Sequence, residues 1–137
     1  MIVTIERVDW QQRVTDVLAL PLNVYIGLAW NGTEGSVART SFVVRHEHLA
    51  LGSLHAAMLY AAMEATCLFA LLPALGKNNH AVTHDFHASV MRTVGLGETC
   101  EIDSRVVKHG RTLAFIEANA GVADKLVATA RVTKSIV

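Results

Sequence analysis

Paired cysteines and an excess of charge of one sign are both missing from this 137-residue sequence. The two cysteines, Cys67 and Cys100, have neither the spacing of a disulfide framework nor that of a zinc site, so we interpret both as reduced thiols. Twelve Lys and Arg residues balance twelve Asp and Glu residues. Because the basic residues are also scattered, the sequence argues against a nucleic-acid partner.

A secretory signal is absent as well, because no basic segment at the start leads into a long apolar run. We therefore expect a cytoplasmic protein. The composition is 52% hydrophobic and only 18% charged. A chain of this length forms one domain, over residues 1–137, but that domain has more apolar surface than it can hide alone. Assembly into an oligomer is the expected consequence.

The longest apolar stretch runs from Gly52 to Pro73 and contains one charged residue, Glu64. Strong helix formers fill it, and the flanking residues start and stop a helix, so we predict a central helix over residues 53–72. A membrane span is disfavoured, since a carboxylate near its middle costs roughly 2.5–3.5 kcal/mol on insertion scales. The sequence therefore predicts a helix enclosed by protein, and its single carboxylate is the first candidate for a functional site.

Strand patterns surround this helix. Residues 1–20 are predicted to form a leader helix, and residues 23–30 and 37–45 a hairpin around the turn 31–35. Four further runs, 81–90, 98–108, 112–121 and 126–137, alternate with a period of two. In the last run the alternation assigns Leu126, Ala128, Ala130, Val132 and Ile136 to the core face, and Val127 to the opposite face.

The predicted fold class is α+β, with an antiparallel sheet of about five to six strands wrapped around one long helix. Such a sheet leaves a stripe of the helix and a sheet edge uncovered. A second copy of the chain is the simplest cover, so we expect a homodimer.

The start of the predicted helix has a distinctive spacing, in which His55 follows Gly52 and Glu64 lies nine residues after His55. Together with segments 82–86, 92–97 and 106–111, this spacing resembles the hotdog-fold thioesterases of the phenylacetate-pathway (PaaI-like) type. The resemblance covers about residues 21–136. It implies the hotdog fold, an acyl-CoA thioesterase activity without metal or redox cofactor, and a homodimer that can pair into a homotetramer.

Two positions depart from that family pattern. The usual Gly-Gly after the histidine is Ala56-Ala57, and the Asn often found six positions before the histidine is Leu49. Glycine lets a thioester carbonyl approach the backbone closely, so the two added methyl groups are expected to narrow the pocket.

The residues support the same chemistry without the family. The first amides of a helix lack intrahelical acceptors, so His55, Ala56 and Ala57 present N–H groups suited to a developing oxyanion. Glu64 can attack the carbonyl or activate water. Ala56 and Glu64 are about 12 Å apart at 1.5 Å per residue, too far to act on one carbonyl. Two antiparallel helices across a two-fold axis would bring each Glu64 to the partner's helix start.

Each of these residues also has a purely structural interpretation. Glu64 can be a core carboxylate satisfied by Tyr60 or Thr66, and His55 can be a helix cap rather than a group that orients substrate. Cys67 lies one turn after Glu64, but no adjacent base favours it as a nucleophile. Arg92, Lys108 and Arg111 can grip coenzyme A phosphates, or they can be solvated side chains. The predicted substrate-binding residues are Tyr60, Cys67, Leu68, Phe86, Arg92, Lys108 and Arg111.

A metal site is disfavoured, since His84 and His87 would lie on opposite faces of a strand and no acidic or cysteine partner has ligand spacing. Two functions other than hydrolysis stay open. One is a non-catalytic hotdog module that binds acyl groups or acts through assembly. The other is a hydratase or dehydratase, which is disfavoured because the His-Phe-Pro and Pro-Gly signatures of acyl-carrier dehydratases are absent around His55.

Overall fold

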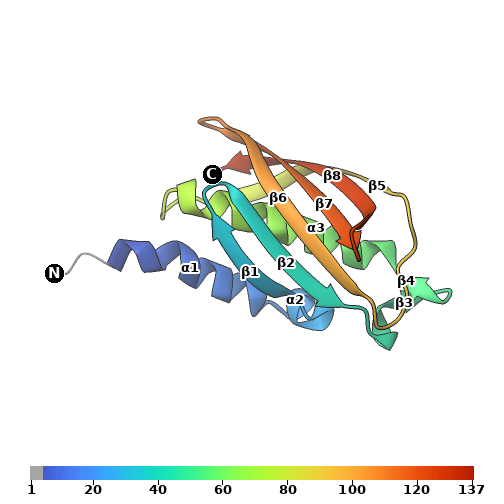
Figure 1. The fold of residues 1–137 in the computed structure, drawn as a ribbon. Helices are drawn as coiled ribbons and strands as arrows, with labels where there is room; N and C mark the ends of the chain where they lie inside the picture. The colour runs from blue at the N-terminus through green and yellow to red at the C-terminus, as the bar shows by residue number, and fades with distance from the viewer. Residues whose placement is uncertain (1–4) are drawn as a thin grey trace.

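The computed structural model describes residues 5–137 (Figure 1). Two helices, α1 (Ile5–Leu18) and α2 (Pro21–Ile26), precede the first strands, and the long helix α3 (Ala56–Leu71) precedes the last four. The strands and short helical turns are β1 (Ala29–Glu34), β2 (Val37–Val43), η1 (His46–His48), β3 (Leu49–Ala50), β4 (Ser53–Leu54), η2 (Leu72–Ala74), β5 (Ala81–Val90), β6 (Thr99–His109), β7 (Leu113–Val122) and β8 (Lys125–Ile136).

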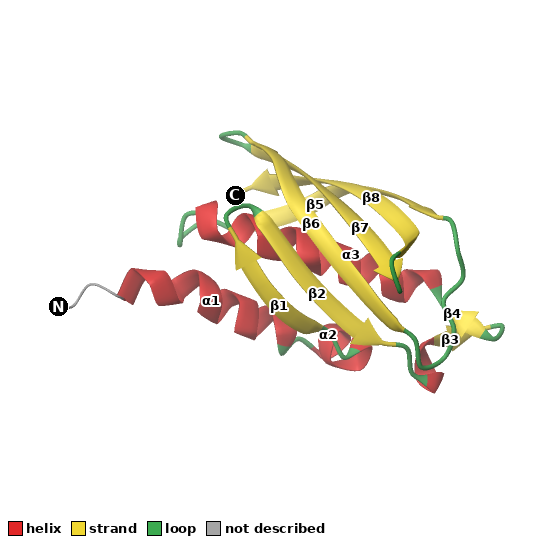
Figure 2. Ribbon diagram, in the orientation of Figure 1, coloured by secondary structure: helices red, strands yellow, loops and turns green. Residues whose placement is uncertain are grey.

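Six strands form one antiparallel sheet in the order β1-β2-β6-β7-β8-β5. The sheet curves over α3, while α1 and α2 lie beside it (Figure 2). Strand β5 follows α3 in sequence but pairs with β8, so it becomes one edge of the sheet and β1 the other. This arrangement confirms the predicted α+β class and is the hotdog fold.

Helix α3 is apolar because most of its surface packs against the sheet. Leu59, Met63, Cys67 and Phe69 are almost inaccessible to solvent. The helical segment Ala56–Ala74 has a mean hydropathy of 1.6 and is long and apolar enough to cross a membrane, yet 56% of it is buried inside the fold. Packing against the sheet accounts for that composition. One stripe stays partly open, however, so the helix is not enclosed on every side by its own chain; its members are Ala57, Tyr60, Ala61, Glu64 and Leu68.

The predicted strand over residues 23–30 is wrong. Its first half is the helix α2, because Pro21 stands at the start with a φ already suited to a helix and Gly27, at φ +76°, ends it. The Asn23 side chain turns back and donates to the carbonyl of Val17 at 2.8 Å. The apparent alternation of Val24 and Ile26 instead reflects one exposed and one buried position on a short helix.

The hairpin between β1 and β2 exists, but its turn lies later than predicted. Glu34 pairs with Val37, so the turn residues are Gly35 and Ser36. Asn31 and Gly32 lie within β1, where the register with β2 shifts between Trp30 and Thr33. A bulge accommodates the Asn-Gly pair that sequence patterns assign to a turn.

Two other boundaries differ from the prediction. The long helix begins at Ala56 rather than residue 53, because Ser53 and Leu54 pair with Leu49 and Ala50 in a small hairpin. The leader helix is described from Ile5, and the first four residues of the predicted 1–20 segment lie outside the described part.

The alternation in β8 also breaks. Ala120 pairs with Ala128 and Gly121 with Leu126, which leaves Val127 as an extra residue. Val127 is therefore buried and Leu126 is 46% exposed, the reverse of the predicted faces.

Candidate functional site

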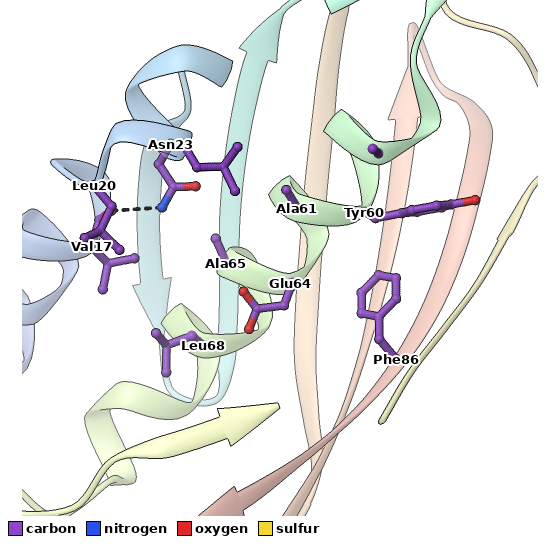
Figure 3. A pocket seen from close by; sticks show the side chains of 11 residues that line it. Val17, Leu20, Asn23, Tyr60, Ala61, Glu64, Ala65, Leu68 and Phe86 are labelled. Atoms are coloured by element: carbon purple, nitrogen blue, oxygen red, sulfur yellow. Dashed lines mark hydrogen bonds between the residues drawn. The ribbon is translucent and has the colours of Figure 1, made fainter. Parts of the chain in front are cut away.

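The open stripe of α3 forms the floor of a pocket of about 510 Å³, which we call the Glu64 pocket (Figure 3). One wall comes from the end of α1 and from α2, and another from Phe86 on β5. Glu64 is the one carboxylate among the lining residues, which are otherwise almost all apolar. They are Val17, Leu20, Leu22, Asn23, Ala57, Tyr60, Ala61, Glu64, Ala65, Leu68 and Phe86.

Glu64 is held by two side chains from the sheet. Lys134 Nζ donates to Glu64 Oε2 at 2.5 Å, and Thr83 Oγ1 donates to the same oxygen at 2.8 Å. The Glu64 side chain keeps 40% of its surface accessible, whereas that of Lys134 keeps 1%. Glu64 is therefore a partly open, ion-paired carboxylate rather than the fully buried one that the sequence predicts.

The predicted structural partners of Glu64 are not the ones observed. Thr66 donates to the carbonyl of Ala62 and pairs with the Thr40 hydroxyl, both at 2.7 Å, on the closed side of the helix. Tyr60 instead stacks at an angle on Phe86, with ring centroids 5.8 Å apart. Both aromatic side chains line the Glu64 pocket, as does Leu68, so the structure places three predicted substrate-binding residues beside Glu64.

Sequence reasoning missed Lys134 and Thr83. The sequence does contain a signal for Lys134, because this lysine interrupts the apolar positions on the predicted core face of the last strand. In the structure Lys134 is 1% exposed. Thr83 is its direct partner on β5. The wall made by Val17, Leu20 and Leu22 was missed too, because no pattern in the leader indicates which face it covers.

The start of α3 presents fewer free amides than predicted. His55 is the N-cap residue, and its Nδ1 accepts a hydrogen bond from the Ala57 amide at 2.9 Å. The His55 amide donates to the carbonyl of His48 at 2.9 Å. Of the amides of His55, Ala56 and Ala57, that of Ala56 alone has no acceptor among the described residues. The structure thus gives His55 a capping contact and leaves one oxyanion donor rather than three.

Ala56 lines a second pocket of about 320 Å³, the helix-start pocket, together with Arg92. The remaining lining residues are Leu54, Leu59, Val90, Met91, Thr93 and Val94. Ala57, one residue later, faces the Glu64 pocket. Ala56, the predicted donor whose amide stays free, and Glu64 therefore line two different pockets of one chain.

Three predicted substrate-binding residues lie elsewhere. Cys67 is a fully buried residue of α3, and burial raises the pKa of its thiol to about 12, so its assignment as a substrate contact is wrong. Lys108 and Arg111 are exposed around the β6–β7 turn and line neither pocket. That turn lies at the opposite end of the sheet from the start of α3 (Figure 1).

Among residues 10–137, whose side chains the structure describes, no three His, Cys, Asp or Glu side chains are grouped so as to hold a metal ion. His84 instead bonds through Nδ1 to the Ser135 hydroxyl at 2.7 Å. His46 and His48 lie in the turn η1.

Comparison with known proteins agrees with this geometry. Residues 51–129 match the model of the thioesterase superfamily, so the chain belongs to that superfamily. A search of curated proteins found no match. Family membership supports thioester hydrolysis as the class of reaction.

Solved structures share the fold. A variant of the phenylacetic acid degradation protein PaaI from Thermus thermophilus is 26% identical, with a TM-score of 0.75 over 84% of this chain and 97% of that one. A conserved protein from Pseudomonas aeruginosa is 23% identical, with a TM-score of 0.83 over 89% and 98%. A Streptococcus mutans protein bound to acetyl CoA is 20% identical, with a TM-score of 0.75 over 80% and 88%.

Proposed function

We propose that this protein is an acyl-CoA thioesterase and that Glu64 acts on the thioester carbonyl. The observation that carries the proposal is one ion-paired, partly exposed carboxylate in a pocket that is otherwise almost entirely apolar. An apolar pocket with a few polar groups is the usual form of a small-molecule site. Its walls fit an acyl or aryl group, and the acetyl CoA bound by the S. mutans structure supports the other half of the substrate.

The reaction splits the acyl carbon–sulfur bond. Glu64 either activates a water molecule by taking its proton or attacks the carbonyl itself to form an anhydride that water then opens. Either route adds one water, yields a carboxylic acid and releases the thiol of coenzyme A, which takes up the proton. The charge that develops on the carbonyl oxygen needs a nearby donor. The Ala56 amide is the unoccupied candidate.

A complete site then requires two chains. Ala56 and Glu64 face different pockets and are about 12 Å apart along the helix axis. A second copy with an antiparallel α3 would bring the helix-start pocket of one chain to the Glu64 pocket of the other. The edge strand β5, which carries Phe86, is a natural surface for that pairing. Light scattering should therefore find a dimer or a dimer of dimers at micromolar concentration, and a stable, active monomer would contradict the two-chain site.

One observation favours a second candidate, a non-catalytic module that binds acyl groups. His55 Nδ1 already accepts the Ala57 hydrogen, and Ala56-Ala57 replaces the glycines that give a carbonyl room to approach. A pocket with too few donors would bind an acyl thioester without polarising it.

Hydrolysis of a panel of acyl-CoAs distinguishes the two functions. Short, long and aromatic acyl-CoAs are mixed with the protein, and thiol release is followed spectroscopically beside the Glu64→Gln variant. Turnover by the wild type that the variant lacks supports the thioesterase. Saturable binding of the same compounds without thiol release would favour the binding module.

A further inference from the structure

Lys134 is the most deeply buried charged side chain near the site, and thioester hydrolysis as described above gives it no part. We propose that Lys134 is a positioning residue, which fixes Oε2 of Glu64 and leaves Oε1 as the single reacting atom. This inference rests on the proposed thioesterase function and deepens it.

The position of Lys134 follows from strand register. Thr83 on β5 and Lys134 on β8 are direct partners in the antiparallel ladder, and both side chains reach Glu64 in the middle of α3. Residues directly opposite each other on one face of a sheet have adjacent side chains. Lys134 Nζ donates to Thr83 Oγ1 at 2.7 Å and to Glu64 Oε2 at 2.5 Å, while Thr83 also reaches Oε2 at 2.8 Å. The three groups form a closed triangle.

The two oxygens of Glu64 therefore differ. Oε2 accepts from an ammonium and from a hydroxyl, whereas Oε1 has no partner among the described residues. Charge-assisted hydrogen bonds stabilise the negative charge on the oxygen that accepts them, so Oε2 is the weaker base and nucleophile. A carboxylate anchored at one oxygen also loses its freedom to rotate, which holds Oε1 in one direction.

Fold stability alone does not account for a buried lysine. The cost of removing an ammonium from water offsets much of the gain from its ion pair, and apolar replacements of buried ion pairs are often neutral or stabilising. Lys134 is 1% exposed and its neighbours on the same face of β8, such as Val132 and Ala130, are apolar. An apolar residue would fill this position without the desolvation cost, which points to a role beyond packing.

The experiment is a double-mutant cycle built on Lys134→Met, which keeps an unbranched side chain one atom shorter and removes the charged amine. Lys125→Gln is the matched control, since Lys125 lies at the exposed start of the same strand. With the acyl-CoA that the wild type hydrolyses best, Lys134→Met should lower kcat by about 100-fold, because a misplaced catalytic group costs that much. KM should change by less than about threefold, since Lys134 does not touch the substrate.

The Glu64→Gln background supplies the readout that a merely structural role would not give. If Lys134 acts through Glu64, adding Lys134→Met to Glu64→Gln should not lower the residual rate further. A folded Lys134→Met variant with wild-type kcat, or a second full loss in the Glu64→Gln background, would overturn the positioning role. If Lys134→Met does not fold, Lys134→Gln is measured in the same cycle and judged by the same outcomes. A wild type without thioesterase activity would refute the proposed function itself, so the two failures are distinguishable.

Discussion

The Glu64 pocket and the helix-start pocket border the same helix, yet they supply opposite kinds of chemistry. The first has an anionic carboxylate held by a buried cation, among apolar walls. The second has an unoccupied backbone amide, at the positive end of the helix dipole, and the cation Arg92. In the proposed mechanism, one chain thus separates the Glu64 carboxylate, which would attack the thioester, from the Ala56 amide and from Arg92. The amide would stabilise the charge that develops on the carbonyl oxygen, and Arg92 would contact the phosphates of coenzyme A.

This difference indicates what each pocket lacks. In the Glu64 pocket the amide hydrogen of Ala57, at the start of α3, is already taken by His55. The helix-start pocket has no carboxylate among its lining residues. If the pockets work together, removal of either half should stop hydrolysis, and each half should leave a different kinetic signature.

The largest expected effect is on the Glu64 pocket. Glu64→Gln should lower kcat by about three orders of magnitude or more, because the amide keeps the shape but is neither nucleophile nor base. The fold should survive, since the amide oxygen can still accept from Lys134. Glu101→Gln, an exposed carboxylate on β6, is the control for loss of charge. Near wild-type turnover by Glu64→Gln would remove Glu64 from the mechanism.

The helix-start pocket is tested by Ala56→Pro, which removes the free amide hydrogen. Proline is tolerated at the first position of a helix, and His55 already has the extended conformation that a residue before proline prefers, with φ −66° and ψ 129°. Loss of one oxyanion donor should lower kcat by about 10²–10³-fold while the fold is kept. Circular dichroism and the thiol-release assay measure both.

Mixing Ala56→Pro with Glu64→Gln decides whether the two pockets meet across chains. In a co-expressed heterodimer, one cross-chain site inherits both defects and the other inherits neither. Activity should therefore return, to about half the wild-type value per heterodimer. Purified, folded heterodimers that stay inactive would show that the site is not shared in this way.

A smaller effect is expected at Arg92, which separates binding from chemistry. Arg92→Gln should raise KM for an acyl-CoA by about tenfold with kcat nearly unchanged, because a phosphate contact stabilises the ground state and transition state alike. Arg39→Gln, an exposed arginine on β2, is the control. An unchanged KM would indicate that Arg92 is a solvated side chain that does not contact the substrate.

The smallest effect concerns the cap at His55. His55→Ala removes the acceptor of the Ala57 amide and should lower the free energy of unfolding by about 1 kcal/mol in chemical denaturation. His55→Asn restores a side-chain acceptor and should recover most of that stability. If His55 only caps the helix, both variants keep kcat within a few-fold of wild type. A loss of kcat that asparagine does not repair would instead assign His55 a contact with the substrate.

Much of the fold could be predicted because its signals are local. The apolar run before Pro73 predicted the long helix, and the period of two predicted β5 to β8 to within about one residue. The errors arose where a local signal has two solutions. The helix α2 begins at Pro21 and is ended by Gly27, but its alternating apolar residues led to the prediction of a strand. The Asn-Gly pair at 31–32 forms a bulge within β1 rather than a turn.

The sequence by itself determined that one carboxylate lies in a long apolar helix, and its spacing from His55 gave the resemblance to the hotdog-fold thioesterases. Only the tertiary structure decided the partners of that carboxylate. Lys134 is 70 residues away from Glu64 in sequence, and the order β7-β8-β5 brings β8 next to β5 beneath α3. Strand order depends on long-range pairing that no local pattern specifies. The Glu64–Lys134 ion pair, the burial of the Cys67 thiol and the placement of Ala56 and Glu64 in two different pockets therefore appear only in the folded chain.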